Sequence, residues 1–475
     1  MNAAILARLL WKRRELHQHD RWTRRQLETY QARMLQQLRQ HAYAHSPFYQ
    51  RYHRGLEHAP LHELPVLTKA TLMEHFDDLV TDRQIRRTAV EAHLQRDLRH
   101  ERYLGRYWLN ATSGSTGRPG LFLFDAAEWA TIMASYARAS DWTGLQTGLR
   151  YRRKFAVVSS TTEWHQSAAV GATIQSPWLP TLRIDSGEPL AAIVAQLNRW
   201  QPEMLTAYAS MAHLLAEEQL AGRLQITPTA VTTASEVLTS AMRQRIEQAW
   251  GKTLFNVYAA TETAGIASEC DHHSGLHLGM DIPTPGRGRN IASECDHHSG
   301  LHLCEDLIIA EAVDAANQPV SAAVYADKLL VTVLFSRTMP LIRYEMSDSI
   351  KLADAGCPCA MPYKLVAGIQ GRVEEILHLS NTSGERVPVQ PIVFHRIMEA
   401  VAAAEWQIVQ TADGLEVLIA GARDGFSADA LAGGLQRELG SQGVAGLPIQ
   451  VVQVAAIPRS AIGKAPLIRA NRERR

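Results

Sequence analysis

Apolar residues follow two spacings along the chain, and each spacing predicts one kind of element. Apolar residues three or four apart recur through residues 1–56 and again over 126–139, which predicts helices. Short apolar runs bounded by polar, Gly or Pro residues predict buried strands. These runs are residues 154–159, 205–208, 230–233 and 254–258. Strands that alternate with helices indicate an α/β domain built on a parallel sheet.

The pattern changes close to residue 371. Beyond it we expect short strands at 406–409, 415–419 and 449–454, and a helix at 428–439. The predicted fold class is therefore α/β: a large N-terminal α/β domain with mostly parallel sheets, plus a small C-terminal α+β lid domain. The expected divisions are an N-terminal helical segment at 1–56, the large domain at 57–371 and the lid domain at 372–475.

An internal repeat interrupts the large domain. Residues 266–278 recur identically at 291–303. Two copies are too few for a solenoid, which needs at least about three units to bury a core. A tandem duplication, or an artefact of cloning or assembly, explains the repeat better. One fold needs only one copy in register, so we expect the other copy, with the linker 279–290, to form a surface loop near the functional site.

Composition narrows the class of protein. The chain has 475 residues, of which 46% are hydrophobic, so it can form two or more domains with sizeable cores. Its formal net charge is only +1, so no overall field favours nucleic acid or an anionic membrane. Residues 1–10 are apolar but too short to span a bilayer, and no cleavage pattern follows them. Five cysteines, an odd number, argue for a reducing compartment. We therefore expect a cytoplasmic protein without a membrane span.

Hydroxyl residues and glycines alternate at 112–120, between apolar runs that predict two strands. Glycine lets backbone N–H groups come close to an anion, and Ser and Thr hydroxyls add donors without a fixed charge. The segment is a candidate phosphate-binding loop, although a flexible linker has the same composition. It lacks the Gly-Lys-Ser/Thr ending of a Walker loop. The candidate phosphate ligands are Thr112, Ser113, Gly114, Ser115, Thr116 and Gly117.

Four further motifs follow this loop in order. They are Tyr258-Ala-Ala-Thr261-Glu262, Ile342-Arg343-Tyr344-Glu-Met-Ser-Asp348, Gly371-Arg372-Val-Glu-Glu, and Pro458-Arg459-Ser-Ala-Ile-Gly463-Lys464. In this order and at these separations, the five motifs resemble the adenylate-forming superfamily of acyl-CoA synthetases, adenylation domains and luciferases. The phenylacetate-CoA ligase branch, with its relatives that adenylylate a deazaflavin coenzyme, is the most similar. The resemblance runs from about residue 45 to the C-terminus and includes a Pro-x-Leu-x-Lys segment that ends at Lys69.

The resemblance implies an ATP- and Mg²⁺-dependent enzyme that activates a carboxylic acid, preferably an aromatic one, to an acyl adenylate and transfers it to CoA. Thr261 would contact the α-phosphate, and Glu262 would hold Mg²⁺, which prefers oxygen ligands. Lys464, on a loop of the lid, would bridge the substrate carboxylate and the α-phosphate and leave after adenylation.

Further residues would bind the nucleotide. By the same resemblance, Asp348 would accept both ribose hydroxyls and Arg372 would approach the ribose or the phosphates. Tyr258 would stack near adenine, although a Tyr at a strand end is also explained by core packing. Ala259 and Ser347 replace glycines that the family usually has, and neither change removes a charged group.

Residues that line the acid pocket are harder to identify. By position, Trp164, His165 and Tyr208 are candidates, and aromatic side chains there would suit a flat aryl acid. Core packing explains Trp and Tyr equally well.

Cysteine and histidine residues form a second chemical pattern. Cys295 with His302, and Cys357 with Cys359, offer the four thiolate and imidazole ligands that Zn²⁺ binds tetrahedrally. Cys270 and His277 offer the same half-site from the other copy. Such a closed set would be structural, although reduced cysteines without a metal are common. Related chains of the branch have a similar pattern.

Three alternatives to a CoA ligase stay open at this level. A carrier-protein thiol could replace CoA as acceptor. A nucleotidyl transferase would leave AMP on a cofactor-like hydroxyl. A catalytically silent homologue would keep only the fold.

Overall fold

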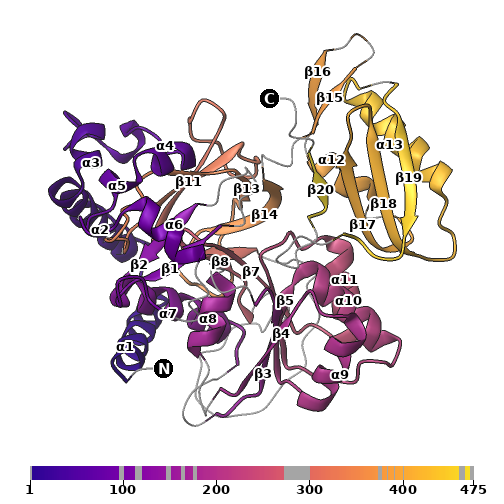
Figure 1. Ribbon diagram of the computed structural model, residues 1–475, viewed down its shortest axis with the longest axis horizontal. Coiled ribbons are helices and arrows are strands. Elements are labelled where there is room, and N and C mark those ends of the chain that lie inside the picture. The colour runs from indigo at the N-terminus through magenta and orange to yellow at the C-terminus, as the bar shows by residue number, and fades with distance from the viewer. Residues whose placement is uncertain are drawn as a thin grey trace.

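The computed structural model describes residues 3–95, 101–112, 120–145, 151–161, 166–174, 179–271, 300–372, 377–381, 383, 385–389, 391–398, 401–444, 446–458 and 466–470. Within these residues a large body, with the N-terminal helices and the main sheet, stands beside a smaller C-terminal body (Figure 1). The main sheet is mostly parallel in its N-terminal half, and the C-terminal body has its own sheet. This mixed α/β architecture confirms the predicted fold class.

Helices dominate the N-terminal quarter. Polar caps fix several of their ends: Thr23 and Gln26, for example, form a reciprocal capping box at the start of α2. No helix within the described ranges is long and apolar enough to cross a bilayer. The helices are α1 (Ala3–His19), α2 (Arg24–His45), α3 (Pro47–Tyr52), the 3₁₀ turn η1 (Leu61–Glu63), α4 (Lys69–Glu74), α5 (Phe76–Leu79) and α6 (Arg87–Gln95).

The main sheet has nine strands in the order β13-β14-β9-β8-β7-β6-β5-β3-β4. The parallel strands are β3 (Phe155–Ser159), β4 (Thr181–Asp185), β5 (Met204–Tyr208), β6 (Ala230–Ala234) and β7 (Leu254–Ala260). The antiparallel strands are β8 (Ala264–Ser268), β9 (Leu301–Leu303), β13 (Asp348–Leu352) and β14 (Leu365–Arg372). Val158, Leu205 and Val231 are fully buried, as both-sided burial of a parallel sheet requires.

Helices alternate with the parallel strands and cover the sheet. Leu197, Leu215 and Ile246, from three of these helices, belong to the apolar core beside the strands. The helices are α7 (Ala126–Trp142), α8 (Gln166–Ile174), α9 (Leu190–Trp200), α10 (Ala209–Leu220) and α11 (Ser240–Trp250).

Two smaller sheets complete the large body. β1 (Trp108–Ala111) and β2 (Leu121–Phe124) form an antiparallel pair. β10 (Ile308–Val313), β11 (Lys328–Val333) and β12 (Tyr344–Met346) form an antiparallel sheet in that order.

The lid domain, described from Leu377 to Ala470, has a core of its own around Phe394, Ile408 and Leu435. Its four-stranded sheet has the order β19-β18-β17-β20. The elements are β15 (Leu377–Ser380), β16 (Arg386–Val389), α12 (Pro391–Met398), β17 (Ala403–Gln410), β18 (Leu415–Ala422), α13 (Ala428–Ser441), β19 (Ile449–Val454) and β20 (Ile468–Arg469). The lid meets the main sheet where α12 contacts β14.

The two copies of the repeat share one structural role, and here our expectation of a single copy in register is wrong. The first copy supplies the last three residues of β8 and the second supplies β9, and the two strands pair antiparallel with Ser268 opposite His302. β8 has to follow β7 directly, and β9 has to lead into the buried residues Glu305 and Asp306. Each copy therefore contributes the half that is adjacent to its own fixed neighbour. The remaining halves and the linker lie at 272–299, outside the described residues.

Candidate functional site

The two ends of the candidate phosphate loop are held together by the β1–β2 pair. The Thr112 N–H donates to the Gly120 carbonyl at 2.9 Å, and the Gly120 N–H donates to Thr112 Oγ1 at 2.8 Å. Thr112 is thus fixed at the mouth of the loop. The other candidate phosphate ligands, from Ser113 to Gly117, lie outside the described residues.

Lys69, at the start of α4, reaches this mouth. Its Nζ lies 3.3 Å from Thr112 Oγ1, and a Cβ built on Gly120 would lie 3.2 Å from Lys69 Cε. The sequence placed Lys69 in a segment that marks the family and gave it no chemical role. The structure places a cationic side chain at the mouth of the candidate phosphate loop, where it would suit an anionic ligand.

Arg343, from the motif that ends at Asp348, anchors the segment that leads to Lys69. This residue is 3% exposed, and its Nη1 donates to the carbonyls of His62 and Leu64, at 2.8 and 2.5 Å. The Leu67 N–H donates to the Arg343 carbonyl at 3.0 Å. The motif around Arg343 therefore positions Lys69, although the two lie more than 270 residues apart in the sequence.

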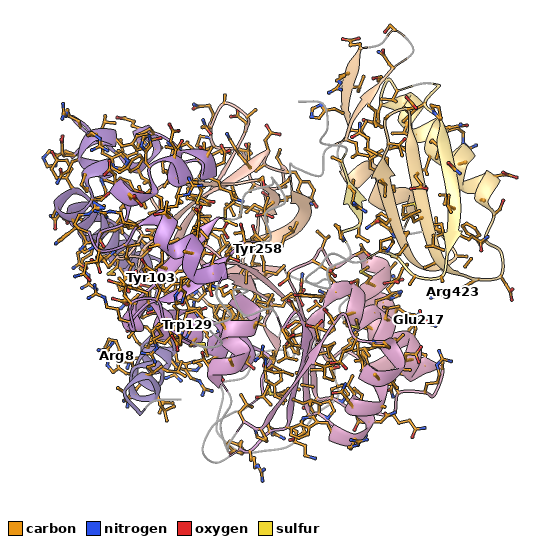
Figure 2. All side chains as sticks on the ribbon, viewed as in Figure 1. Arg8, Tyr103, Trp129, Glu217, Tyr258 and Arg423 are labelled. Atoms are coloured by element: carbon orange, nitrogen blue, oxygen red, sulfur yellow. The ribbon has the colours of Figure 1, made fainter. Side chains whose placement is uncertain are left out.

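Thr261 and Glu262 lie in the turn that follows β7. Because β3, β5, β6 and β7 are parallel, this turn is at the same edge of the sheet as the carboxyl ends of the other three strands, which is where open α/β sheets bind ligands. Gln166 of α8 donates from Nε2 to the Thr261 carbonyl at 3.3 Å. No sequence motif pointed to Gln166. Tyr258 is half-buried on β7 in the same region (Figure 2).

Asp348 and Arg372 are brought opposite each other by the pairing of β13 with β14. Asp348 is buried, with 8% exposure. Two residues that are 24 positions apart in the sequence are thus neighbours on adjacent strands, as two groups that bind the same nucleotide would have to be. Lys464, the predicted catalytic residue of the lid, lies outside the described residues.

Tyr208 is tied into the core. It is 3% exposed, and its hydroxyl accepts a hydrogen bond from the Ser160 N–H at 3.0 Å, which joins the ends of β5 and β3. Trp164 and His165, the other two candidates for the acid pocket, lie outside the described residues. An aryl-acid pocket therefore stays a prediction.

Four side chains that could bind a metal ion lie close together. They are Cys270, His302, Cys357 and Cys359, whose ligand atoms all lie within 4.8 Å of one another. Cys270 comes from the first copy of the repeat and His302 from the second, so the set mixes the two half-sites that the sequence offered. Cys295 and His277 lie outside the described residues.

The spacing of these atoms suits tetrahedral zinc. Cys270 Sγ and Cys357 Sγ are 3.8 Å apart, and Cys359 Sγ lies 3.3 Å from His302 Nε2. A tetrahedral ion with Zn–S bonds of ~2.3 Å separates two sulfurs by about 3.8 Å, and a sulfur from an imidazole nitrogen by about 3.5 Å. The residues present therefore fit Zn²⁺.

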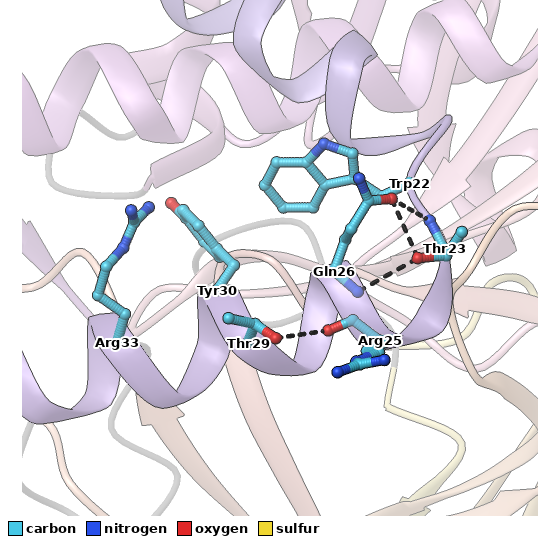
Figure 3. A pocket seen from close by; sticks show the side chains of 7 residues that line it. All are labelled: Trp22, Thr23, Arg25, Gln26, Thr29, Tyr30 and Arg33. Atoms are coloured by element: carbon cyan, nitrogen blue, oxygen red, sulfur yellow. Dashed lines mark hydrogen bonds between the residues drawn. The ribbon is translucent and has the colours of Figure 1, made fainter.

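A shallow hollow on the outer surface is separate from these groups. It has a volume of about 400 Å³ and lies along the start of α2, as Figure 3 shows. Its lining residues are Trp22, Thr23, Arg25, Gln26, Thr29, Tyr30 and Arg33. None of them belongs to the candidate site.

Comparison with known proteins identifies the class of fold: the chain has the fold of the adenylate-forming CoA ligases. Crystal structures of 2-hydroxyisobutyryl-CoA ligase are similar over nearly the whole chain. In the postadenylation state, in complex with R3-HIB-AMP, that enzyme matches with a TM-score of 0.67 at 19% identity, covering 94% of this chain and 90% of the ligase. In the thioesterification state, with 2-HIB-AMP and CoA, the TM-score is 0.55 at 18% identity, covering 95% and 91%.

A curated relative gives a more partial match. Protein CapK of Staphylococcus aureus is 22% identical over 302 residues, which cover 62% of this chain. The match spans about half the length of CapK, 54%. No family model matches the chain.

Proposed function

We propose that this protein is an ATP- and Mg²⁺-dependent acid–thiol ligase that adenylates a small carboxylic acid and transfers the acyl group to CoA. The observation that carries the proposal is the occurrence of the five motifs, in order, in a chain that has the fold of CoA ligases. The candidate phosphate loop, with Lys69 beside it, would bind the phosphates. Glu262, in the turn after β7, would provide a carboxylate ligand for Mg²⁺. Asp348, opposite Arg372, would accept hydrogen bonds from the ribose.

The first half-reaction joins two anions, so the site has to neutralise charge and align the attack. A carboxylate oxygen of the acid bonds to the α-phosphorus of ATP, and the bond from that phosphorus to pyrophosphate breaks. Lys69, Thr112 and the loop would hold the leaving phosphates, and Lys464 would bridge the two reacting anions. Mg²⁺, when bound by Glu262, supplies further positive charge at the phosphates.

In the second half-reaction the CoA sulfur, having lost its proton, bonds to the acyl carbon and AMP leaves. An aromatic acid is the proposed substrate class, on the strength of the phenylacetate-ligase motifs and the Trp164-His165 segment.

Pyrophosphate release from ATP, measured with a panel of aryl and aliphatic acids with and without CoA, tests this function. We expect acid-dependent release, and Lys464→Ala should lower it by about 10²-fold or more, the usual effect of losing a group that stabilises developing charge. Lys252→Ala, at an exposed position after α11, is the matched control and should change little. If the protein is folded and no acid of the panel causes it to release pyrophosphate, the proposal is contradicted.

We propose also that Cys270, His302, Cys357 and Cys359 hold one structural Zn²⁺. The closed set of four protein ligands leaves no open position for a substrate, which is typical of a structural site. Cys270 follows β8 and the Thr261-Glu262 turn, whereas Cys357 and Cys359 follow β13 and Asp348. The ion would therefore link the Thr261-Glu262 turn to β13, the strand that carries Asp348.

The repeat offers matched control variants for this site, because each ligand from it has a twin in an identical local sequence. Metal analysis of the purified protein should find about one zinc per chain. Cys270→Ser and His302→Ala should reduce it, whereas Cys295→Ser and His277→Ala should not. Equal loss from Cys295→Ser and Cys270→Ser would contradict the mixed ligand set, and parent protein that binds no zinc would contradict the site.

A further inference from the structure

An ion pair joins the lid domain to the large domain through residues that are not part of the candidate site. Arg423 follows β18 of the lid, and its Nη2 donates to Oε1 of Glu217 on α10. Figure 2 shows the two residues together where the lid faces α10 and α11. We call this pair the lid contact.

Both partners of the lid contact are held in place by their own domains. Glu217 also accepts a bidentate pair of hydrogen bonds from Arg245 of α11, at 2.7 and 2.8 Å. Burial raises the pKa of Glu217, but the hydrogen bonds from Arg245 and the charges of Arg423 and Arg245 outweigh this, so its pKa is lowered and it stays ionised. On the lid, the Arg423 backbone donates to the Ala402 carbonyl at 2.9 Å. A fixed carboxylate therefore faces an arginine whose backbone is fixed.

Crystal structures of one relative match the arrangement of this chain to different degrees in its different states. The same 2-hydroxyisobutyryl-CoA ligase matches with TM-scores of 0.67 in its postadenylation state, 0.57 in an open conformation and 0.55 in its thioesterification state. Sequence identity, 18–19%, and coverage of this chain, 94–95%, are nearly constant. Identity and coverage therefore do not account for the difference, and of these three states the postadenylation state is the best overall match to this chain.

We propose that the lid contact selects this arrangement of the lid, as the one in which the acid is adenylated and the acyl adenylate is first held, and that Arg423 is a positioning residue which has to release Glu217 before the lid moves on. The assignment of the arrangement to a half-reaction rests on the proposed function. Arg423 is 43% exposed at its side chain and Glu217 20%, so the pair is partly solvated and its strength is modest. A contact of this strength favours the observed arrangement of the lid and still allows the lid to move to another arrangement.

The position of the lid can be measured without catalysis. Two spin labels, carried by an unnatural ketone amino acid at exposed Leu220 of α10 and Gln436 of α13, would report the distance between the domains. Cysteine labelling is avoided because of the Cys270 cluster. Arg423→Ala should lower the ratio of the main population to the others about 1.5- to 5-fold. Arg423→Glu, which repels Glu217, should lower it more, and Arg423→Lys should restore most of it. Arg437→Ala, at an exposed lid position on α13, is the control.

The half-reactions supply a second readout. Arg423→Ala should slow acid-dependent pyrophosphate release and leave unchanged, or speed, thioester formation from a preformed adenylate, whereas simple loss of stability would slow both. An Arg423→Ala distance distribution equal to that of the parent overturns the lid contact. If Arg423→Ala changes the distance distribution between the labels but the parent protein has no acid-dependent activity, the lid contact is supported and the proposed ligase function is contradicted.

Discussion

At the scale of single residues, a buried ion pair is a constraint that lies outside the candidate site. Arg138 of α7 and Asp306 are 0% and 1% exposed and form two hydrogen bonds, at 2.7 and 2.9 Å. His19 of α1 contacts the same carboxylate at 2.8 Å. Burial alone would raise the pKa of Asp306, but the charge of Arg138 and the hydrogen bonds from His19 and Arg138 outweigh burial and hold the pKa at about 2.

Asp306→Asn should destabilise the fold by about 3–5 kcal/mol, because it leaves the Arg138 charge buried without its main partner. The same change in the exposed Arg51–Asp78 pair, Asp78→Asn, should cost at most about 1 kcal/mol. Since the folded pKa of Asp306 is below its ordinary 3.8, its contribution is complete above about pH 4 and is lost as the pH falls toward 2. Denaturant unfolding at pH 7 and at pH 3 measures both effects. Equal losses for the two variants would argue against a buried pair.

At the scale of elements, the repeat is the unusual feature. Removal of residues 273–297 joins the first half of one copy to the second half of the other and restores a single copy, with Cys270, Gly300 and His302 in place. The connection between β8 and β9, residues 269–300, shortens from 32 residues to 7 (32 minus 25). Loop-closure entropy predicts a gain of about 1 kcal/mol for two doublings of length.

We expect the deletion variant to keep its zinc and its fold, and to unfold at a slightly higher denaturant concentration. As a paired test, Gly300→Ala should destabilise the protein, because Gly300 has a φ of +104° and a Cβ there would lie 2.4 Å from the Val366 carbonyl oxygen. Gly275→Ala, its twin in the first copy, should be nearly neutral. Loss of zinc from the deletion variant would show that residues outside the mixed set are needed.

At the scale of the whole molecule, the lid has a core that is separate from those of the large domain. We expect two transitions in calorimetry. Leu435→Ala, at a fully buried position of α13, should lower the stability of one transition by about 2–5 kcal/mol, and Leu205→Ala on β5 should do the same to the other. A single transition that both variants shift equally would mean that the domains unfold together.

Much of the fold follows from local patterns. The strand predicted at 449–454 matches β19, and the strands at 230–233 and 254–258 lie within β6 and β7. The helices predicted at 126–139 and 428–439 are two to three residues shorter than α7 and α13, which end at Trp142 and Ser441. Apolar spacing is a local property, so one sequence is enough to read it.

By itself, the sequence determined the fold class, the order of the motifs and the residue types available for phosphate, ribose and metal. Only the tertiary structure decided which of these meet. The two copies of the repeat are identical, so nothing local can distinguish Cys270 from Cys295 or His277 from His302; pairing of β8 with β9 and with their fixed neighbours makes that choice. Lys69 reaches the phosphate loop for the same kind of reason, since hydrogen bonds from distant Arg343 place its segment. Contacts between residues far apart in the sequence form only when the chain packs into its tertiary structure, so the local spacing of apolar residues does not predict them.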